Sequence, residues 1–500
     1  MFFLFFIKIF LFGILEFFHY KFFFLFLPQM SETTKPVLNA CFLGHVDSGK
    51  STTLGHFAYK KGAVDERKMD KLRKEASLKG RDSFEYAFVG DQSEAERARG
   101  ISITVTLIKV ETKKLQINCL DCPGHRDFLK NMIKGAAQAD VGVVLVPSSS
   151  NEFEAAISGG TLRDHIMTAG VLGVKRMIIC VNKLDTIPEA DRERRFNEVK
   201  DEMKRIATRV HPDKDPIVLP ISGLMGTNIV DDAPKFEWFK GWKSAKGETG
   251  PVFTLEEAFN TMTPPARPND QPLRLQISGV LKVQGIGVVA TGRIDSGTLK
   301  PNMNLIIQPS GVVVDTKTVE THKTQRTEIF SGENCGISFK QPTKGKIEAI
   351  KPGDVISDTK CNPAIACHGA KAKVIIVEHP KGIREGYAPV MDIGVHHVPV
   401  KIEKILSKRV PGVKEEVPSP DLVSKGESGV FIIRSTKPVV FEDVKTFPTL
   451  ARFALRDSAR IVGIGAVEVK YTKEEFEKEF PAKENKKDKG GDAKNKKARG

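Results

Sequence analysis

Short hydrophobic runs alternate with amphipathic stretches in the first half of the chain, behind an apolar leader. The runs are rich in Val, Ile and Leu, which is typical of strands buried in a parallel sheet. The stretches between them carry apolar positions at helical spacing. Strands alternating with helices predict an α/β domain with a mostly parallel sheet. The expected strands cover residues 37–43, 115–120, 141–146, 176–181 and 217–221, and two of the expected helices cover 160–169 and 189–207.

The pattern changes at a proline-rich stretch, 264–272. Its prolines favour extended backbone, so we expect a stiff linker here. Beyond it the chain consists of short alternating runs between Gly, Pro and Asn turns, which predicts β barrels or sandwiches. A break at Cys361-Asn362-Pro363 divides this region in two. The expected domains are therefore an α/β domain at 36–263 and two β domains at 273–362 and 363–472.

Both ends of the chain depart from this pattern. The last 20 residues hold eight basic and three acidic side chains, so residues 473–500 are expected to form a basic disordered tail, with anion binding as the alternative. The leader, 1–35, carries 12 of the 31 Phe residues within positions 1–26. Three interpretations of it stay open: translated non-coding sequence before a start at Met30, a weak membrane anchor that would bury Glu16, or a secretory signal.

Composition narrows the class of protein. Charged residues make up 28% and hydrophobic residues 40%, which excludes a wholly disordered chain and a polytopic membrane protein. Seven cysteines without a regular spacing favour a reducing compartment, and we expect a cytoplasmic location. The 77 basic and 62 acidic residues give a net charge of +15, which is compatible with a polyanionic partner.

The strongest candidate site begins where the first expected strand ends. The spacing G-x-x-x-x-G-K-[ST], between a strand and a helix, is typical of a phosphate-binding loop. Its glycines let backbone N–H groups converge on phosphate oxygens, while Lys50 reaches the β- and γ-phosphates and the Ser51 hydroxyl ligates Mg²⁺. The predicted nucleotide-binding residues here are Gly44, His45, Val46, Asp47, Ser48, Gly49, Lys50, Ser51 and Thr52.

The segment Asn182-Lys183-Leu184-Asp185 predicts which base is bound. A carboxylate accepts hydrogen bonds from both N1–H and the N2 amino group of guanine, a pairing that adenine does not offer. We expect Asp185 to take this role, Asn182 to hold the loop and base, and Lys183 to lie across the ring. The loop expected to close over the guanine O6 consists of Ser222, Gly223 and Leu224.

Two further segments predict metal binding and hydrolysis. In Asp121-Cys122-Pro123-Gly124-His125, Asp121 is expected to bind Mg²⁺ through water and the Gly124 N–H to face the γ-phosphate. Phosphoryl transfer depends mainly on positioning and charge stabilisation, so a side chain must orient the attacking water, and His125 is the candidate. Ser102 is expected to complete the Mg²⁺ shell when the γ-phosphate is present, which makes an order–disorder switch.

These segments together resemble the translational GTPases, in particular the elongation factor 1-alpha family of eukaryotes and archaea. The resemblance runs from about Pro36 to about Tyr471 and includes Gly124-His125-Arg126-Asp127-Phe128 and Phe239-Lys240-Gly241-Trp242. It implies an α/β P-loop GTPase domain followed by two β-barrel domains, and a cycle between GTP and GDP with Mg²⁺. The GTP form would carry aminoacyl-tRNA to the ribosomal A site, where codon pairing triggers hydrolysis.

The resemblance also implies roles for residues outside the nucleotide segments. Val46 and Ile101 match an apolar gate that keeps the catalytic His125 from the attacking water until the ribosome acts. Ser102 and Leu224 stand where the family usually has Thr and Trp. The implied tRNA contacts are Glu320, His322 and Asn334 in the aminoacyl pocket of the first barrel, and Arg452 and Arg456 in the second barrel.

The implied partners are aminoacyl-tRNA, the ribosome and a guanine-nucleotide exchange factor, with the chain acting as a monomer. One alternative is a release- or rescue-factor GTPase that carries a protein in place of tRNA. Another is a structural role, the cross-linking of actin through basic barrel surfaces and the tail. No membrane partner is expected unless the leader is an anchor.

Overall fold

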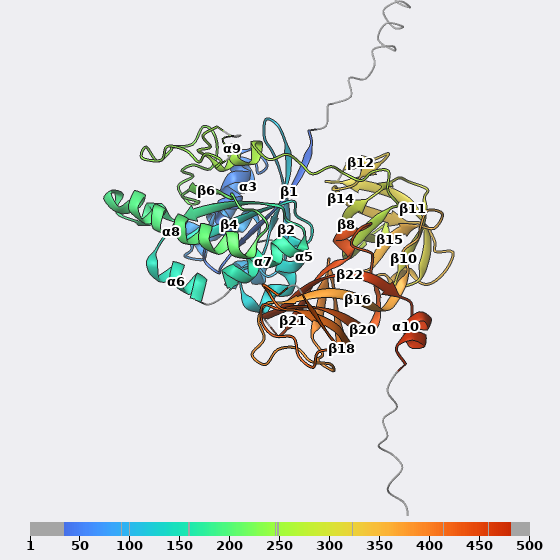
Figure 1. The fold of residues 1–500 in the computed structure, drawn as a ribbon. Coiled ribbons are helices and arrows are strands. Elements are labelled where there is room, and N and C mark those ends of the chain that lie inside the picture. Colours follow the sequence, from blue (N-terminus) through green and yellow to red (C-terminus); the bar gives the residue numbers. More distant parts are fainter. Residues whose placement is uncertain are drawn as a thin grey trace, which may run out of the picture. The chain divides into compact units, whose positions relative to one another are not determined.

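The computed structural model describes residues 35–481, apart from 92, 100, 159–160, 246, 248–249, 323, 414 and 459. The leader up to residue 34, Gly100 and the tail from residue 482 lie outside the described residues, so the predictions made for them stay predictions. From Val37 onward the described chain forms one compact unit. Figure 1 shows its sheets and helices in sequence colours.

The first domain is built on a six-stranded sheet in the order β2-β3-β1-β4-β5-β6. All neighbouring pairs are parallel except β2 with β3, which is antiparallel. The strands are β1 (Val37–Gly44), β2 (Thr106–Glu111), β3 (Gln116–Asp121), β4 (Val141–Pro147), β5 (Arg176–Asn182) and β6 (Ile217–Pro220).

The sheet is buried on both faces, which explains its continuous hydrophobic runs. Along β1, Leu38 and Phe42 belong to one hydrophobic cluster, and Cys41 and Leu43 to the other. The helices of this domain are α2 (Lys50–Lys60), α3 (Glu66–Leu78), α4 (Glu94–Arg99), α5 (Leu129–Ala136), α6 (Ser150–Ser158), α7 (Thr161–Leu172), α8 (Glu189–Val210) and α9 (Leu255–Asn260).

Two closed β-barrels follow. In the first, β10 pairs with both β15 and β11 and so closes the order β10-β15-β7-β8-β14-β11. Its strands are β7 (Arg274–Val283), β8 (Gly287–Ser296), β10 (Asn304–Gln308), β11 (Val312–Thr321), β14 (Asn334–Phe339) and β15 (Val355–Asp358), with the short β9 (Thr298–Leu299), β12 (Thr324–Arg326) and β13 (Ile329–Phe330) beside them.

The second barrel closes in the same way, because β17 pairs with both β21 and β18. Its strands are β16 (Ala366–Ile376), β17 (Val390–Ile393), β18 (His396–Arg409), β20 (Ser428–Val440), β21 (Arg452–Asp457) and β22 (Arg460–Tyr471), with β19 (Glu416–Pro418) added to β18. The predicted fold class, a P-loop α/β domain followed by two β-barrels, is confirmed.

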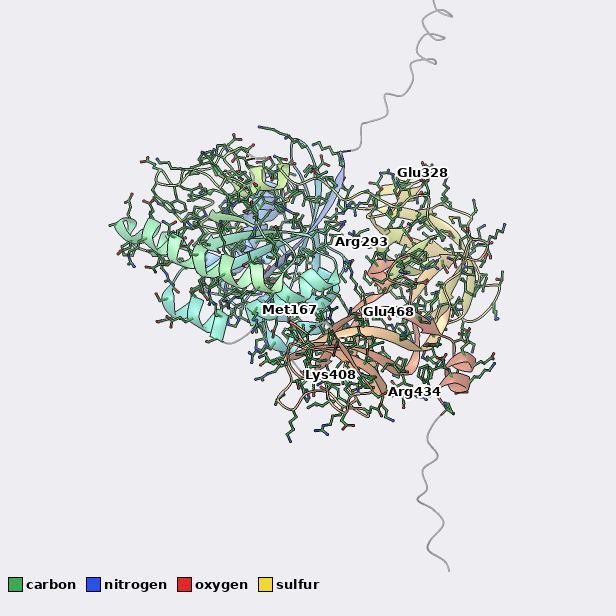
Figure 2. The ribbon with its side chains drawn as sticks, viewed as in Figure 1. Met167, Arg293, Glu328, Lys408, Arg434 and Glu468 are labelled. Atoms are coloured by element: carbon green, nitrogen blue, oxygen red, sulfur yellow. The ribbon has the colours of Figure 1, made fainter. Side chains whose placement is uncertain are left out.

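The prediction of a disordered tail is wrong for the first residues of that segment. Residues Lys473–Glu479 form helix α10, which begins with a capping box between Thr472 and Glu475. Phe476 is buried, and the guanidinium of Arg434 lies 4.6 Å from the centre of its ring. Figure 2 labels Arg434 on the second barrel. A single aromatic residue in a charged segment therefore anchors this turn of chain to the second barrel.

No helix in the described part of the chain is both long enough and apolar enough to cross a bilayer.

Candidate functional site

The phosphate-binding loop connects β1 to α2 through residues with unusual backbone angles. Gly49 caps α2 at φ 86°, and Asp47 has φ 58°; such left-handed conformations cost a glycine least. A Cβ on Gly124 would lie 2.5 Å from the Lys50 Nζ and 2.8 Å from the Gly44 carbonyl. The loop and the Gly124 segment thus approach more closely than other residue types allow.

Lys50 is held at the floor of this loop. Its Nζ donates to the His45 carbonyl at 2.7 Å, and the Ser48 hydroxyl donates to the same oxygen at 2.9 Å. Burial lowers the pKa of Lys50, although nearby Asp121 opposes this shift. A buried ammonium aimed into a loop of backbone N–H groups is suited to bind phosphate oxygens.

Hydroxyl and carboxylate oxygens meet beside this lysine. The Ser51 Oγ lies 3.0 Å from the Ser102 Oγ, which donates to Asp91 Oδ1 at 3.1 Å. Asp121 is buried, and its Oδ1 has no hydrogen-bond partner among the described residues. This set of oxygens fits Mg²⁺, which prefers one or two carboxylates together with phosphate and water.

Asp91 is a member of this cluster that the sequence analysis missed. Burial, together with the nearby Asp121, raises the pKa of Asp91 to about 7, and burial raises the pKa of Asp121 to about 6. Two carboxylates with raised pKa values in one site favour a cation between them. Asp91 belongs to no recognisable motif, so no local signal in the sequence could have found it.

Asn182 connects the base-binding side of the site to the phosphate-binding loop. Its Nδ2 donates to the Ser48 carbonyl at 2.9 Å, and its Oδ1 accepts from the Gly223 N–H at 2.8 Å. Lys183 has φ 64°, and its Nζ pairs with Glu152 at 2.7 Å. Glu152, on α6, is a second residue that the sequence analysis missed.

A cavity of about 500 Å³ lies over these elements. His125 lines it, and its ring Nδ1 accepts from the Asp127 N–H at 3.2 Å. The predicted residues that line the cavity are Val46, Asp47, Gly49, Lys50, Ser51, Thr52, Ile101, Ser102, Gly124, His125, Asn182, Lys183, Asp185 and Leu224. The remaining predicted residues, Gly44, His45, Ser48, Asp121, Ser222 and Gly223, are not in that lining.

Helix α7 contacts the phosphate-binding loop. The His45 Nδ1 and the Thr161 Oγ1 are 2.5 Å apart, and burial lowers the pKa of His45. His165, one turn further along α7, is fully buried, and this burial lowers its pKa to about 3. Neither Thr161 nor His165 was predicted, because their role depends on α7 packing against the loop.

A second cavity, also of about 500 Å³, lies between the first domain and the first barrel. The structure brings Glu320, His322 and Asn334 together in its lining, with Thr104 and Val105 of the first domain. His322 has φ 48°, and a Cβ on Gly336 would lie 3.0 Å from the Glu320 carboxylate.

The two arginines predicted for tRNA lie elsewhere. Arg456 donates to the buried Asp392 at 2.8 and 3.2 Å and to the Ser458 carbonyl at 2.8 Å. Arg452 is half-buried, and a Cβ on Gly173 would lie 3.7 Å from its guanidinium. The structure therefore does not bring these two residues to the second cavity.

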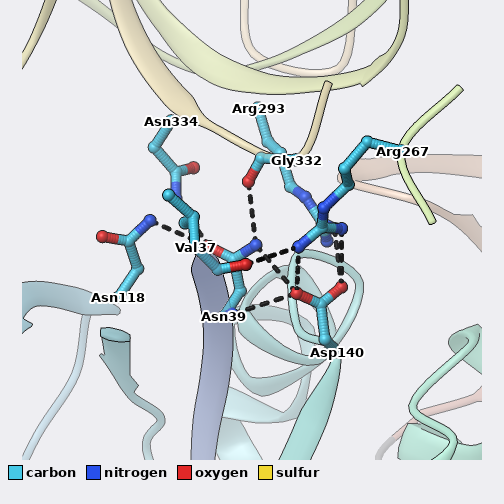
Figure 3. A network of polar contacts seen from close by, with 8 residues as sticks. All are labelled: Val37, Asn39, Asn118, Asp140, Arg267, Arg293, Gly332 and Asn334. Atoms are coloured by element: carbon cyan, nitrogen blue, oxygen red, sulfur yellow. Dashed lines mark hydrogen bonds and ion pairs between the residues drawn. The ribbon is translucent and has the colours of Figure 1, made fainter. Parts of the chain in front are cut away.

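Asp140 joins the first domain to the first barrel (Figure 3). Its carboxylate accepts from Arg267 at 2.7 and 3.1 Å and from Arg293 of β8 at 2.9 Å. Asn39 of β1 donates to the same carboxylate at 3.1 Å and to the Gly332 carbonyl at 2.8 Å. Burial alone would raise the pKa of Asp140, but the two arginines hold it below its usual range.

This combination of site and fold defines the class of protein. The chain matches the Elongation factor Tu GTP binding domain over residues 35–265, Elongation factor Tu domain 2 over 287–357, and the GTP-eEF1A C-terminal domain-like model over 369–468. A phosphate-binding loop in such a domain, followed by two barrels, is that of a translational GTPase.

Whole-chain relatives give the particular family. Elongation factor 1-alpha of Encephalitozoon cuniculi is 48% identical over 453 residues, which cover 90% of this chain and 95% of that protein. Elongation factor 1-alpha of Entamoeba histolytica is 42% identical over 438 residues, 87% of this chain and 95% of that protein. The chain belongs to the elongation factor 1-alpha family and is a GTPase.

Solved structures share the fold at lower identity. The GTPase-like domain of Ski7 from S. cerevisiae superposes with a TM-score of 0.70 at 18% identity, over 87% of this chain and 98% of that one. Translation elongation factor SelB from Methanococcus maripaludis gives a TM-score of 0.62 at 16% identity, over 89% of this chain and 81% of that one. These two structures are evidence for the fold alone.

Proposed function

We propose that the GTP form of this translation elongation factor delivers aminoacyl-tRNA to the ribosomal A site, and that hydrolysis triggered there releases it. The main support for this proposal is that one segment, residues 101–105, lines both cavities. Ile101 and Ser102 line the nucleotide cavity, and Thr104 and Val105 line the second cavity beside the barrel. A rearrangement of this segment with the γ-phosphate would change both cavities together.

Mg²⁺ is the metal proposed for the nucleotide site. Ser51 and Ser102 would hold it directly and Asp121 through water, with Asp91 hydrogen-bonded to the Ser102 hydroxyl. When bound, the ion neutralises charge on the phosphate oxygens. Asp185 is proposed to read guanine, while Asn182 keeps the base-binding loop against the phosphate-binding loop.

His125 is proposed to orient the attacking water. It lines the nucleotide cavity together with Val46 and Ile101, the pair proposed as an apolar gate. The side chain is 44% exposed, and among the described residues its polar contacts are with Asp127 alone, so a small rotation of the ring is enough to redirect it.

The second cavity is proposed to hold the charged 3′ end of the tRNA through Glu320, His322 and Asn334. Arg452 and Arg456 are proposed to contact the tRNA arm. We also propose that the chain acts as a cytoplasmic monomer and is recharged with GTP by a nucleotide-exchange factor.

The test compares charged and uncharged tRNA of the same sequence in binding to the chain with a non-hydrolysable GTP analogue. We expect the charged form to bind at least about 100-fold more tightly, because only it fills the second cavity with polar groups that pair. Equal affinity for the two forms would contradict delivery and would favour a GTPase that carries a protein.

A further inference from the structure

Lys134 of α5 is a cationic residue in the lining of the second cavity. It lies one turn from Asn131, and both residues line the cavity opposite Glu320, His322 and Asn334. The residues proposed for the aminoacyl pocket all belong to the first barrel, whereas Lys134 belongs to the first domain. The cavity therefore has a wall on the first domain that also carries functional groups.

The polar neighbours of Lys134 are already engaged. The Asn131 Nδ2 donates to the Ile103 carbonyl at 2.6 Å, and the Gln138 Nε2 donates to the Lys134 carbonyl at 2.8 Å. Among the described residues, by contrast, no carboxylate forms an ion pair with the Lys134 ammonium. The side chain is half-buried, and this burial, together with Lys130, lowers the pKa of Lys134.

Half burial covers the stem of a lysine and leaves its ammonium able to pair with an anion that enters the cavity. Glu320 carries the opposite charge in the same cavity, so the lining is suited to a ligand that has both an anionic and a cationic group. The aminoacylated 3′ end of a tRNA has both: its backbone phosphates are anionic, and the α-ammonium of its amino acid is cationic.

We propose that Lys134 is a binding residue of this pocket, and that its ammonium pairs with an anionic group at the charged 3′ end of the tRNA. This inference rests on the proposed function. Two sources share the chemistry: a phosphate near the terminal nucleotide, which every tRNA carries, or the side-chain carboxylate of an attached Asp or Glu.

The experiment measures binding of alanyl- and glutamyl-tRNA to Lys134→Met, to Lys134→Arg and to the unchanged chain, with a non-hydrolysable GTP analogue and at several salt concentrations. Lys300→Met is the matched control, because the Lys300 ammonium pairs with Glu328 at 3.1 Å elsewhere on the first barrel. GTP affinity and melting temperature of each variant report on folding.

If the anion is a phosphate, Lys134→Met lowers the affinity for both tRNAs by about 10- to 100-fold. The slope of log affinity against log salt then falls by about 0.7–0.9, and Lys134→Arg keeps most of the affinity. If the anion is a side-chain carboxylate, only the affinity for glutamyl-tRNA falls.

Affinities of Lys134→Met within twofold of the control for both tRNAs would overturn the inference. Should Lys134→Met fail to fold, Lys134→Gln replaces it, with the same criteria. If the unchanged chain itself binds neither charged tRNA, the proposed function fails, which is a different result from the loss of this one contact.

Discussion

His125 is a residue whose position suits a catalytic role better than a structural one. Its side chain is 44% exposed and lines the nucleotide cavity. Among the described residues, its ring Nδ1 accepts from the backbone N–H of Asp127 and lies 3.5 Å from the carboxylate of that residue. Substitution should therefore leave the fold and the phosphate-binding loop in place.

We expect His125→Ala to lower ribosome-stimulated GTP hydrolysis by about 10²- to 10⁴-fold, the range typical of a group that assists proton transfer or orients water. GTP affinity should change little, as measured by nucleotide titration. Glu154→Gln, at an exposed position of α6, is the control, because its side chain lies outside the cavity lining. Stimulated hydrolysis by His125→Ala at the rate of the control would refute the assigned role.

Sequence alone predicted the nucleotide-binding residues whose spacing forms a motif, such as Lys50 and Asn182. The structure places both in the lining of one cavity. Asp91 and Glu152 could not be predicted in this way. Each reaches the site because the fold brings separate segments together: Asp91 through Ser102, and Glu152 of α6 through Lys183.

Helix α10 shows where prediction of whole elements failed. The strands and helices of the first domain follow clear hydrophobic periodicity, whereas the segment 473–479 has one apolar residue among charged ones. Its stability comes from the docking of Phe476 on the second barrel, where a Cβ on Gly369 would collide with the ring. Sequence patterning does not report such a contact.

We expect Phe476→Ala to lower the free energy of unfolding of the chain by about 3 kcal/mol, because it removes a buried aromatic side chain. Denaturant unfolding followed by circular dichroism measures this loss. Glu474→Ala, at an exposed position of the same helix, serves as the control. Identical unfolding midpoints for the two variants would show that α10 adds nothing to the stability of the barrel.

In the molecule as a whole, Asp140 links the sheet that carries the nucleotide site to the barrel that carries Asn334. Its side chain is 6% exposed and meets Arg267 of the linker and Arg293 of β8 (Figure 3). Asn39 extends the network, because its Oδ1 accepts from Asn118 at 3.0 Å and from Asn334 at 3.5 Å.

Asp140→Asn would leave two largely buried guanidinium groups without their carboxylate. Loss of one partner from a buried ion pair costs about 3–5 kcal/mol, so we expect a lower melting temperature and weaker binding of charged tRNA. Glu328→Gln, which breaks an exposed ion pair on the same barrel, is the control (Figure 2). Unchanged melting and tRNA affinity in Asp140→Asn would contradict the coupling of barrel and sheet through this residue.

Delivery requires the bound nucleotide to decide whether the chain holds charged tRNA. The most direct measurement is the affinity for one charged tRNA with a GTP analogue and with GDP, under the same salt and Mg²⁺. We predict tight binding with the GTP analogue and a loss of at least about 100-fold with GDP, a coupling of about 2.7 kcal/mol. Equal affinity in the two nucleotide states would contradict it.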